Sequence, residues 1–172
     1  MSRILPHIRT LEPIIDATDS TIGFDESEID TSISTRSARL KWVVVVNDSV
    51  AVGRAMNAAI CAAGATIAGV AGLLGPDAVD GAGSTHPGLP WAGCTVLVAD
   101  PATLRTLRAK CDAHEGTFVS DMPLAAQETR VYDEYLEAMK TSQSDQIDYL
   151  AVSIVGPKNR IDKLVGRLPL MP

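Results

Sequence analysis

Aromatic and basic residues are both scarce in this chain of 172 residues. Phe, Trp and Tyr make up 4% of the sequence, so the core must be built from Val, Leu, Ile and Ala, within a hydrophobic fraction of 46%. Acidic residues outnumber Lys and Arg, and the net charge is −6. Because binding to a nucleic-acid duplex requires clustered Lys and Arg, we expect no nucleic-acid partner.

Cysteine is also rare, and its spacing excludes two kinds of site. Cys61, Cys94 and Cys111 are far apart, they form no CxxC pair, and no His lies at ligand spacing from them. A disulfide framework and a zinc site are therefore not indicated, and we expect neither a metal nor a cofactor. Cys61 falls in an apolar helical segment and is expected to be a buried, inert thiol.

No basic segment followed by an apolar one opens the chain, so we expect a cytoplasmic protein. A different feature raises the question of a membrane span, since no charge occurs from Ala55 to Leu74. Ala and Gly dominate this stretch and Asn57 interrupts it, which makes insertion into a membrane unfavourable. Small residues let a helix lie close on a sheet, and we expect that arrangement here.

Regular structure is predicted from residue 41 onward. Lys41–Asn47 contains a continuous β-branched run, which is typical of a strand buried on both faces, and Asn47–Ser49 forms a turn after it. A long helix follows Gly53. Its predicted apolar face comprises Val52, Met56, Ile60, Ala63, Ile67 and Val70.

The rest of the chain alternates between strands and helices. Asp100 and Pro101 are an N-cap and a first-turn Pro, and they predict a helix start after the second strand. The alternation predicts one three-layer α/β domain, with helices on both faces of the sheet. Further strands are predicted at 94–99, 117–120 and 150–155, a long loop at 75–93, and helices at 125–140 and 159–165, the first with Val131, Tyr135, Leu136 and Met139 inward.

The segment 1–40 differs from the domain 41–172 in composition. It places short apolar groups among Asp, Ser, Thr and Glu, and it keeps no period for more than about a turn. Two interpretations stay open. The segment is either a flexible or surface-draped arm, or it contains a short amphipathic helix at Leu11–Ala17.

Polar residues near the start of the first helix are candidate ligand contacts. The turn contains Asp48, and Arg54 lies in the first helical turn, either solvated or directed at an anionic ligand. Asn57 interrupts the apolar helix as a structural clamp or as a ligand contact. Neither GxGxxG nor GxxxxGK[ST] is present, so no nucleotide fingerprint supports the site.

Two further regions are expected to contribute to the same cleft. The 75–93 loop offers Asp77, Asp80 and His86 as ligand contacts, but without a G-x-S-x-G elbow it does not indicate a hydrolytic triad. Asp121 follows the third strand. Ligands of open α/β sheets gather beyond the carboxyl ends of strands, so Asp121 is either a turn residue or a catalytic carboxylate facing Asp48 and Arg54.

Four blocks of sequence resemble an uncharacterised, mainly bacterial family called domain of unknown function 2000. They are VVVVNDSVAVGRAMNAA, LLGPDAVDGAGSTHPG, AAQETRVYDEYLEAM and IVGPKNRIDKLVGRLPLM, and the resemblance runs from about Leu40 to Pro172. The family in turn resembles the type-2 peptidyl-tRNA hydrolases. That resemblance implies a small four-stranded mixed sheet with helices on both sides.

The residues that match the hydrolase motif depart from it. Arg54 stands where those enzymes have Lys, Ile60 where they have Gln, and Ala63 where they have His. Their catalytic Asp matches Asp121, but the residues after Asp121 differ from the hydrolase motif. Since Ile cannot replace the hydrogen bonds of Gln, the resemblance supports the fold and the position of the cleft more than the activity.

We therefore expect a protein that binds a small metabolite in a cleft at the start of the first helix. A first alternative is a hydrolase acting on an ester or amide, with Asp121 as base and Arg54 as anion clamp; peptidyl-tRNA hydrolysis itself is less expected. A second alternative is a structural or regulatory module whose Ala/Gly-rich helix face packs against a copy of itself, and a homodimer is expected.

Overall fold

The structure is a computed structural model, and it describes residues 22–172. The hypothesised helix at Leu11–Ala17 lies outside the described residues. The elements, in chain order, are the short 3-10 turns Glu26–Glu28 and Thr35–Ser37, β1 (Leu40–Asn47), α1 (Val52–Gly69), β2 (Ala78–Val79), β3 (Thr85–His86), β4 (Thr95–Ala99), α2 (Pro101–Asp112), β5 (Phe118–Pro123), α3 (Leu124–Glu128), α4 (Tyr132–Thr141), β6 (Tyr149–Pro157) and α5 (Lys158–Val165).

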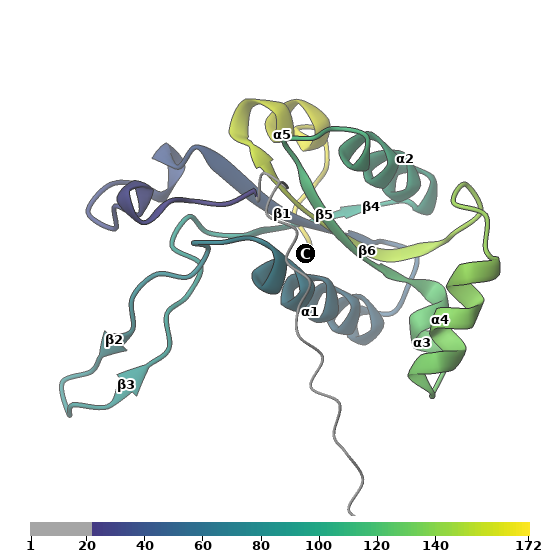
Figure 1. The fold of residues 1–172 in the computed structure, drawn as a ribbon, viewed down its shortest axis with the longest axis horizontal. Coiled ribbons are helices and arrows are strands. Elements are labelled where there is room, and N and C mark those ends of the chain that lie inside the picture. The colour runs from purple at the N-terminus through teal and green to yellow at the C-terminus, as the bar shows by residue number, and fades with distance from the viewer. Residues whose placement is uncertain (1–21) are drawn as a thin grey trace, which may run out of the picture.

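A four-stranded mixed sheet forms the centre of the domain. Its strand order is β4-β1-β6-β5; β1 runs parallel to β4 and antiparallel to β6, and β5 runs antiparallel to β6. Figure 1 shows α1 on one side of this sheet and α2 with α5 on the other. The structure confirms the predicted three-layer α/β fold with helices on both faces.

Strand β1 is buried on both faces, as its β-branched run predicts. Val43 and Val45 contribute to the core beneath α2 and α5, whereas Val44 and Val46 contribute to the core beneath α1. None of these four side chains is more than 2% exposed. The strand can be apolar throughout because neither side of it reaches solvent.

The face of α1 that contacts the sheet is not the predicted one. Four large apolar residues of the predicted face, Val52, Met56, Ile60 and Ile67, are between 40% and 68% exposed. A row of small side chains is buried instead: Ala55, Ala58, Ala59, Ala62 and Thr66. Both rows have helical spacing, but only the small one allows the helix axis to come close to the strands.

Two other expectations about α1 change with this orientation. Cys61 is exposed rather than buried. The row of alanines packs against the sheet of its own domain, so it is not available to a second copy of the chain. Self-association stays a prediction, and it would have to use another surface. Within residues 22–172, no helix is both long enough and apolar enough to cross a membrane.

A buried polar network ties α1 to three strands. The indole Nε1 of Trp42 donates to Ser153 Oγ at 2.8 Å, on β1 and β6 respectively. Thr66 Oγ1 of α1 lies 2.7 Å from Ser153 Oγ and 2.8 Å from Ser120 Oγ of β5. Thr66 and Ser153 are fully buried, so these bonds satisfy groups that are costly to leave unpaired.

The region between β5 and β6 departs from the predicted helix at 125–140. The segment forms two helices, α3 and α4, because the backbone is extended at Thr129 and Val131. Val131 and Leu136, which were expected to point inward, are about half exposed. Strand β5 is longer than predicted, so Asp121 lies within it rather than after it.

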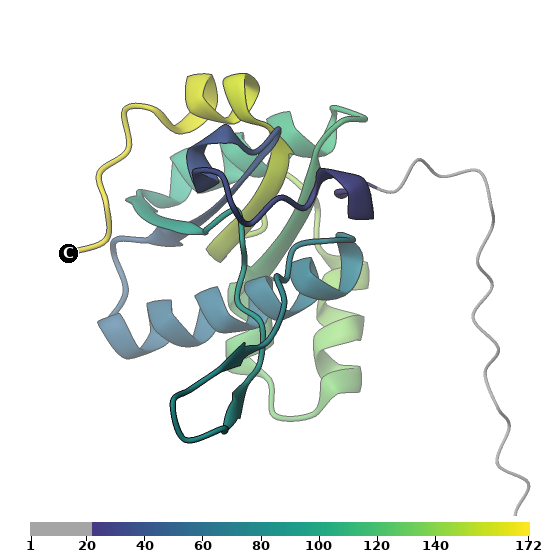
Figure 2. The same cartoon turned by 90° about the vertical axis from the view of Figure 1, so that its left-hand side faces the viewer.

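Two segments without long elements also take defined positions. Residues 75–93 include the β2–β3 hairpin, which projects from the domain (Figure 2).

Residues 22–39 lie on the surface of the domain, in agreement with a surface-draped arm. Phe24 is 5% exposed and its ring centroid is 4.8 Å from that of Trp91, while Arg39 pairs with Glu28 and lowers the pKa of that carboxyl to about 2.

Two glycines of α1 provide a test of how closely this helix packs. A Cβ at Gly64 would meet no atom within 4 Å, whereas a Cβ at Gly69 would lie 2.4 Å from the Phe118 ring. Gly64→Ala should raise the free energy of unfolding by about 0.5–1 kcal/mol, because Gly is the less favourable residue inside a helix.

Gly69→Ala should lower the same free energy by about 1–3 kcal/mol, because the added methyl group overpacks the contact with Phe118. Urea denaturation of both variants and the parent protein measures the two effects. Equal changes for the two substitutions would contradict the described packing of α1.

Candidate functional site

A groove runs from the start of α1 to α4, along the edge strand β5. It consists of a hollow of about 550 Å³ beside α4 and a hollow of about 580 Å³ beside the start of α1. Cys61, Met122 and Ala126 line both hollows, so the two are continuous. We call this surface the α1–α4 groove. Three of the predicted site residues, Arg54, Asn57 and Asp121, line it.

At the α1 end of the groove, the polar groups are paired with one another. Arg54 Nε donates to Gln127 Oε1 at 2.9 Å, and Gln127 Nε2 donates to Asn57 Oδ1 at 2.9 Å and to the Arg54 carbonyl at 3.0 Å. These bonds fasten α3 to α1, which favours the structural-clamp interpretation of Asn57. Gln127 was not predicted as a site residue, because a single amide in the short segment LAAQE carries no signal.

At the α4 end, Asp121 is a partly buried carboxylate. Its side chain is 17% exposed, and Arg108 Nε of α2 lies 3.1 Å from its Oδ2. Arg108 also pairs with Asp112 on its own helix. Burial raises the pKa of Asp121, while the hydrogen bond and charge of Arg108 lower it, and burial has the larger effect.

Tyr135 of α4 lines the same part of the groove as Asp121. Its pKa is raised, first by burial and then by the negative charge of Asp121. The tyrosine therefore keeps its proton and can donate a hydrogen bond. The rings of Tyr132 and Tyr135 meet edge to face, with centroids 5.4 Å apart. This end of the groove combines aromatic surface with the Asp121 carboxyl and with donors that include Arg130, Thr129 and the two tyrosine hydroxyl groups.

The remaining predicted residues lie elsewhere. Asp80 accepts hydrogen bonds from the Ala82 and Ser84 amides inside the β2–β3 hairpin, and these bonds, with His86 at 3.4 Å, lower its pKa. Asp77 accepts from the amide of Gly88 in the same segment.

Figure 1 shows this hairpin apart from α3 and α4, and it shares no lining residue with the groove. Asp48 lies in the turn after β1 and pairs with Ser49. The structure therefore does not bring all seven predicted residues into one cleft. The hairpin carboxylates lie in a separate part of the chain, where they stabilise a turn through bonds to backbone amides.

The described residues 22–172 contain no group of three His, Cys, Asp or Glu side chains arranged to hold a metal ion. A ligand in the groove would meet an apolar floor, two tyrosines, Arg130 and the Asp121 carboxyl.

These features define a small α/β domain with a mixed sheet and one ligand-sized groove beside its edge strand. The chain belongs to the family described as Protein of unknown function (DUF2000), whose model matches residues 40–172. A search of the curated proteins gave no match.

A solved structure with a similar fold is that of a protein of unknown function, Atu0240, from Agrobacterium tumefaciens strain C58. Its TM-score is 0.70 at 17% sequence identity, and the match covers 78% of this chain and 98% of the other. At that identity the likeness concerns the fold alone. Neither description names an activity, so the resemblance to the peptidyl-tRNA hydrolases stays a prediction.

Removing the cation next to Asp121 should raise the pKa of that carboxyl further. In Arg108→Gln the hydrogen bond and charge that oppose burial are lost, and the protonated form gains relative to the carboxylate. The side-chain carboxyl carbon of Asp121, followed by NMR as the pH is changed, reports the shift.

Arg105→Gln is the matched control for this measurement, because Arg105 lies on the same helix and pairs with Asp148 instead. It should leave the pKa of Asp121 unchanged. An unchanged pKa in Arg108→Gln would show that the Arg108–Asp121 pair does not form in solution.

Proposed function

We propose that this protein binds a small metabolite in the α1–α4 groove. The observation that carries the proposal is a partly buried carboxyl, Asp121, at one end of a ligand-sized apolar groove. A hollow of about 550 Å³ falls within the range of small-molecule sites, which are mostly apolar with a few polar groups that orient the ligand.

The lining supports a ligand with an apolar body and a hydrogen-bonding group. Met122, Val131 and the tyrosine rings offer apolar surface, and the Asp121 carboxylate accepts hydrogen bonds. A hydroxyl or amino group directed at Asp121 would fit this lining. Arg54 and Asn57 would act indirectly, because their bonds to Gln127 hold the α3 wall of the groove in place.

A metabolite screen by thermal shift tests the proposal. Tyr132 is 74% exposed and lines the groove, so Tyr132→Ala should leave the fold intact and weaken binding of any stabilising compound at least fivefold. The loss follows from the removed aromatic contact. Isothermal titration of the wild type and the variant measures the change.

Leu136→Ala serves as the control, since Leu136 is exposed on the same helix and does not line the groove. It should bind the compound as the wild type does. A compound that binds both variants with unchanged affinity would place its site outside the groove and contradict the proposal.

A second candidate function is hydrolysis of an ester or amide, favoured by one observation. Asp121 combines burial, a raised pKa and access to the groove, which is the environment that suits a general acid or base. If it acts so, Asp121→Asn should reduce turnover at least a hundredfold on any active member of an ester and amide panel. Turnover that is unchanged by this substitution would exclude the role, and peptidyl-tRNA belongs in the same panel.

A further inference from the structure

A second cavity lies at the amino ends of β1 and β4, and it follows from the register of these strands. Strand β1 begins at Leu40, but β4 begins only at Thr95, which pairs with Val43. The first three residues of β1 therefore extend past β4 and leave a notch. Residues 35–38, residues 92–94 and the start of α5 enclose it as a cavity of about 410 Å³.

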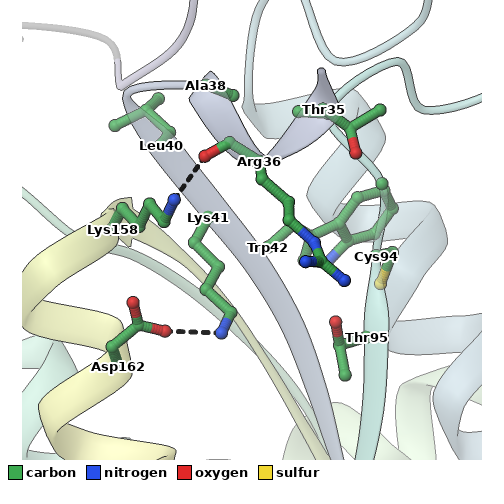
Figure 3. Close-up of a pocket in the computed structure, with 12 residues that line it drawn as sticks. Thr35, Arg36, Ala38, Leu40, Lys41, Trp42, Cys94, Thr95, Lys158 and Asp162 are labelled. Carbon is green, nitrogen blue, oxygen red and sulfur yellow. Dashed lines mark hydrogen bonds and ion pairs between the residues drawn. The ribbon is translucent and has the colours of Figure 1, made fainter.

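The charged side chains of this cavity are mainly basic. Arg36, Lys41 and Lys158 face a single carboxylate, Asp162. Lys41 Nζ lies 2.5 Å from Asp162 Oδ1, and Lys158 Nζ donates to the backbone carbonyl of Arg36. Within residues 22–172, the guanidinium of Arg36 makes no hydrogen bond. Figure 3 shows it directed into the cavity, towards Trp42.

Hydroxyl groups and an apolar wall complete the lining. In Figure 3 the guanidinium of Arg36 lies between the hydroxyl groups of Thr35 and Thr95. Leu40 and Trp42 supply apolar surface. Desolvation of the thiolate by the surrounding protein raises the pKa of the Cys94 thiol to about 12, so this residue adds no negative charge to the cavity at neutral pH.

We propose that this cavity binds a small phosphate monoester. The excess of two positive charges matches a phosphate dianion, and it occurs in a chain whose net charge is −6. A guanidinium fork and two hydroxyl groups supply directional donors to the phosphate oxygens, and the two ammonium groups act as point charges. The wall formed by Leu40 and Trp42 receives the organic part of the ester.

This site is separate from the α1–α4 groove. The two share no lining residue, and they lie at different strands of the sheet. Trp42 connects the cavity to the buried network, because its indole donates to Ser153 while its side chain lines the cavity. Its indole N–H is therefore a reporter of occupancy.

Titration with phenyl phosphate, followed by ¹H–¹⁵N NMR, tests the site. The chain has two tryptophans, and only Trp42 lines this cavity, so its indole signal should shift with saturation while that of Trp91 stays in place. Phenyl phosphate should bind more tightly than inorganic phosphate, and phenol should not bind. Equal binding of phenol, or no saturable shift, would overturn the proposal.

Arg36→Gln should weaken phenyl phosphate binding at least tenfold, because among the three cations of the cavity it removes the one whose side chain has no partner among the described residues. Its side chain is exposed, so the fold should not depend on it. Lys163→Gln is the matched control. It removes the same charge from α5 at an exposed position outside the cavity lining, and it should leave binding unchanged.

Equal weakening by the two substitutions would mean that only the general electrostatic field attracts the anion, and it would overturn the assignment of the site. Tenfold weaker binding in Arg36→Gln alone, with the shift at Trp42 reduced to the same extent, supports it.

Discussion

The close contact between the small-residue face of α1 and the sheet determines which side chains α1 presents to solvent and where the groove lies. Four alanines and Thr66 face the strands, so the helix lies near the backbone of the sheet. The Thr66 hydroxyl then reaches Ser120 and Ser153 directly. With larger side chains in this row, the hydroxyl groups would be separated and buried without partners, at a cost of about 1–3 kcal/mol each.

The same contact explains why α1 presents large aliphatic side chains to solvent. A helix has one face for the sheet, and here the small residues occupy it. The exposed side of α1 then becomes one wall of the groove, and Arg54 and Asn57 stand where Gln127 of α3 can bridge them. The position of the groove is thus a consequence of helix packing and of the clamp between α1 and α3.

The two candidate sites differ in their charged groups, and each reflects an edge of the sheet. Beside β5 the groove contains one carboxyl, whose pKa is raised by burial, together with Arg54 and Arg130. At the amino end of β4, where β1 extends past its neighbour, an excess of basic groups collects. The ligands that we propose for the two sites therefore differ in chemistry, and the two sites share no lining residue.

Much of the architecture followed from local sequence. The valine run predicted the buried strand β1, and Asp100 with Pro101 predicted the start of α2, where the Asp100 carboxylate accepts the Thr103 amide. The family match covers residues 40–172, the part of the chain that the four sequence blocks indicated. Such features are predictable because strand burial, helix capping and turn formation depend on residues close in the chain.

Other features needed the tertiary structure. Two rows of α1 share the helical period, and only packing on the sheet decides which is buried. The partners of Asp121 and Asn57 lie 13 and 70 residues away along the chain, so no spacing predicts them. The basic cavity is lined by residues from the arm, β1, β4 and α5. It exists because β1 begins before the position at which β4 starts to pair with it.

The sequence by itself therefore determined the four strands of the main sheet, the start of α2 and the family of this protein. Only the tertiary structure decided which face of α1 is buried, which side chains line the groove and where the basic residues converge. The physical reason is that local backbone preferences act over a few residues, whereas sites are assembled from contacts between distant segments.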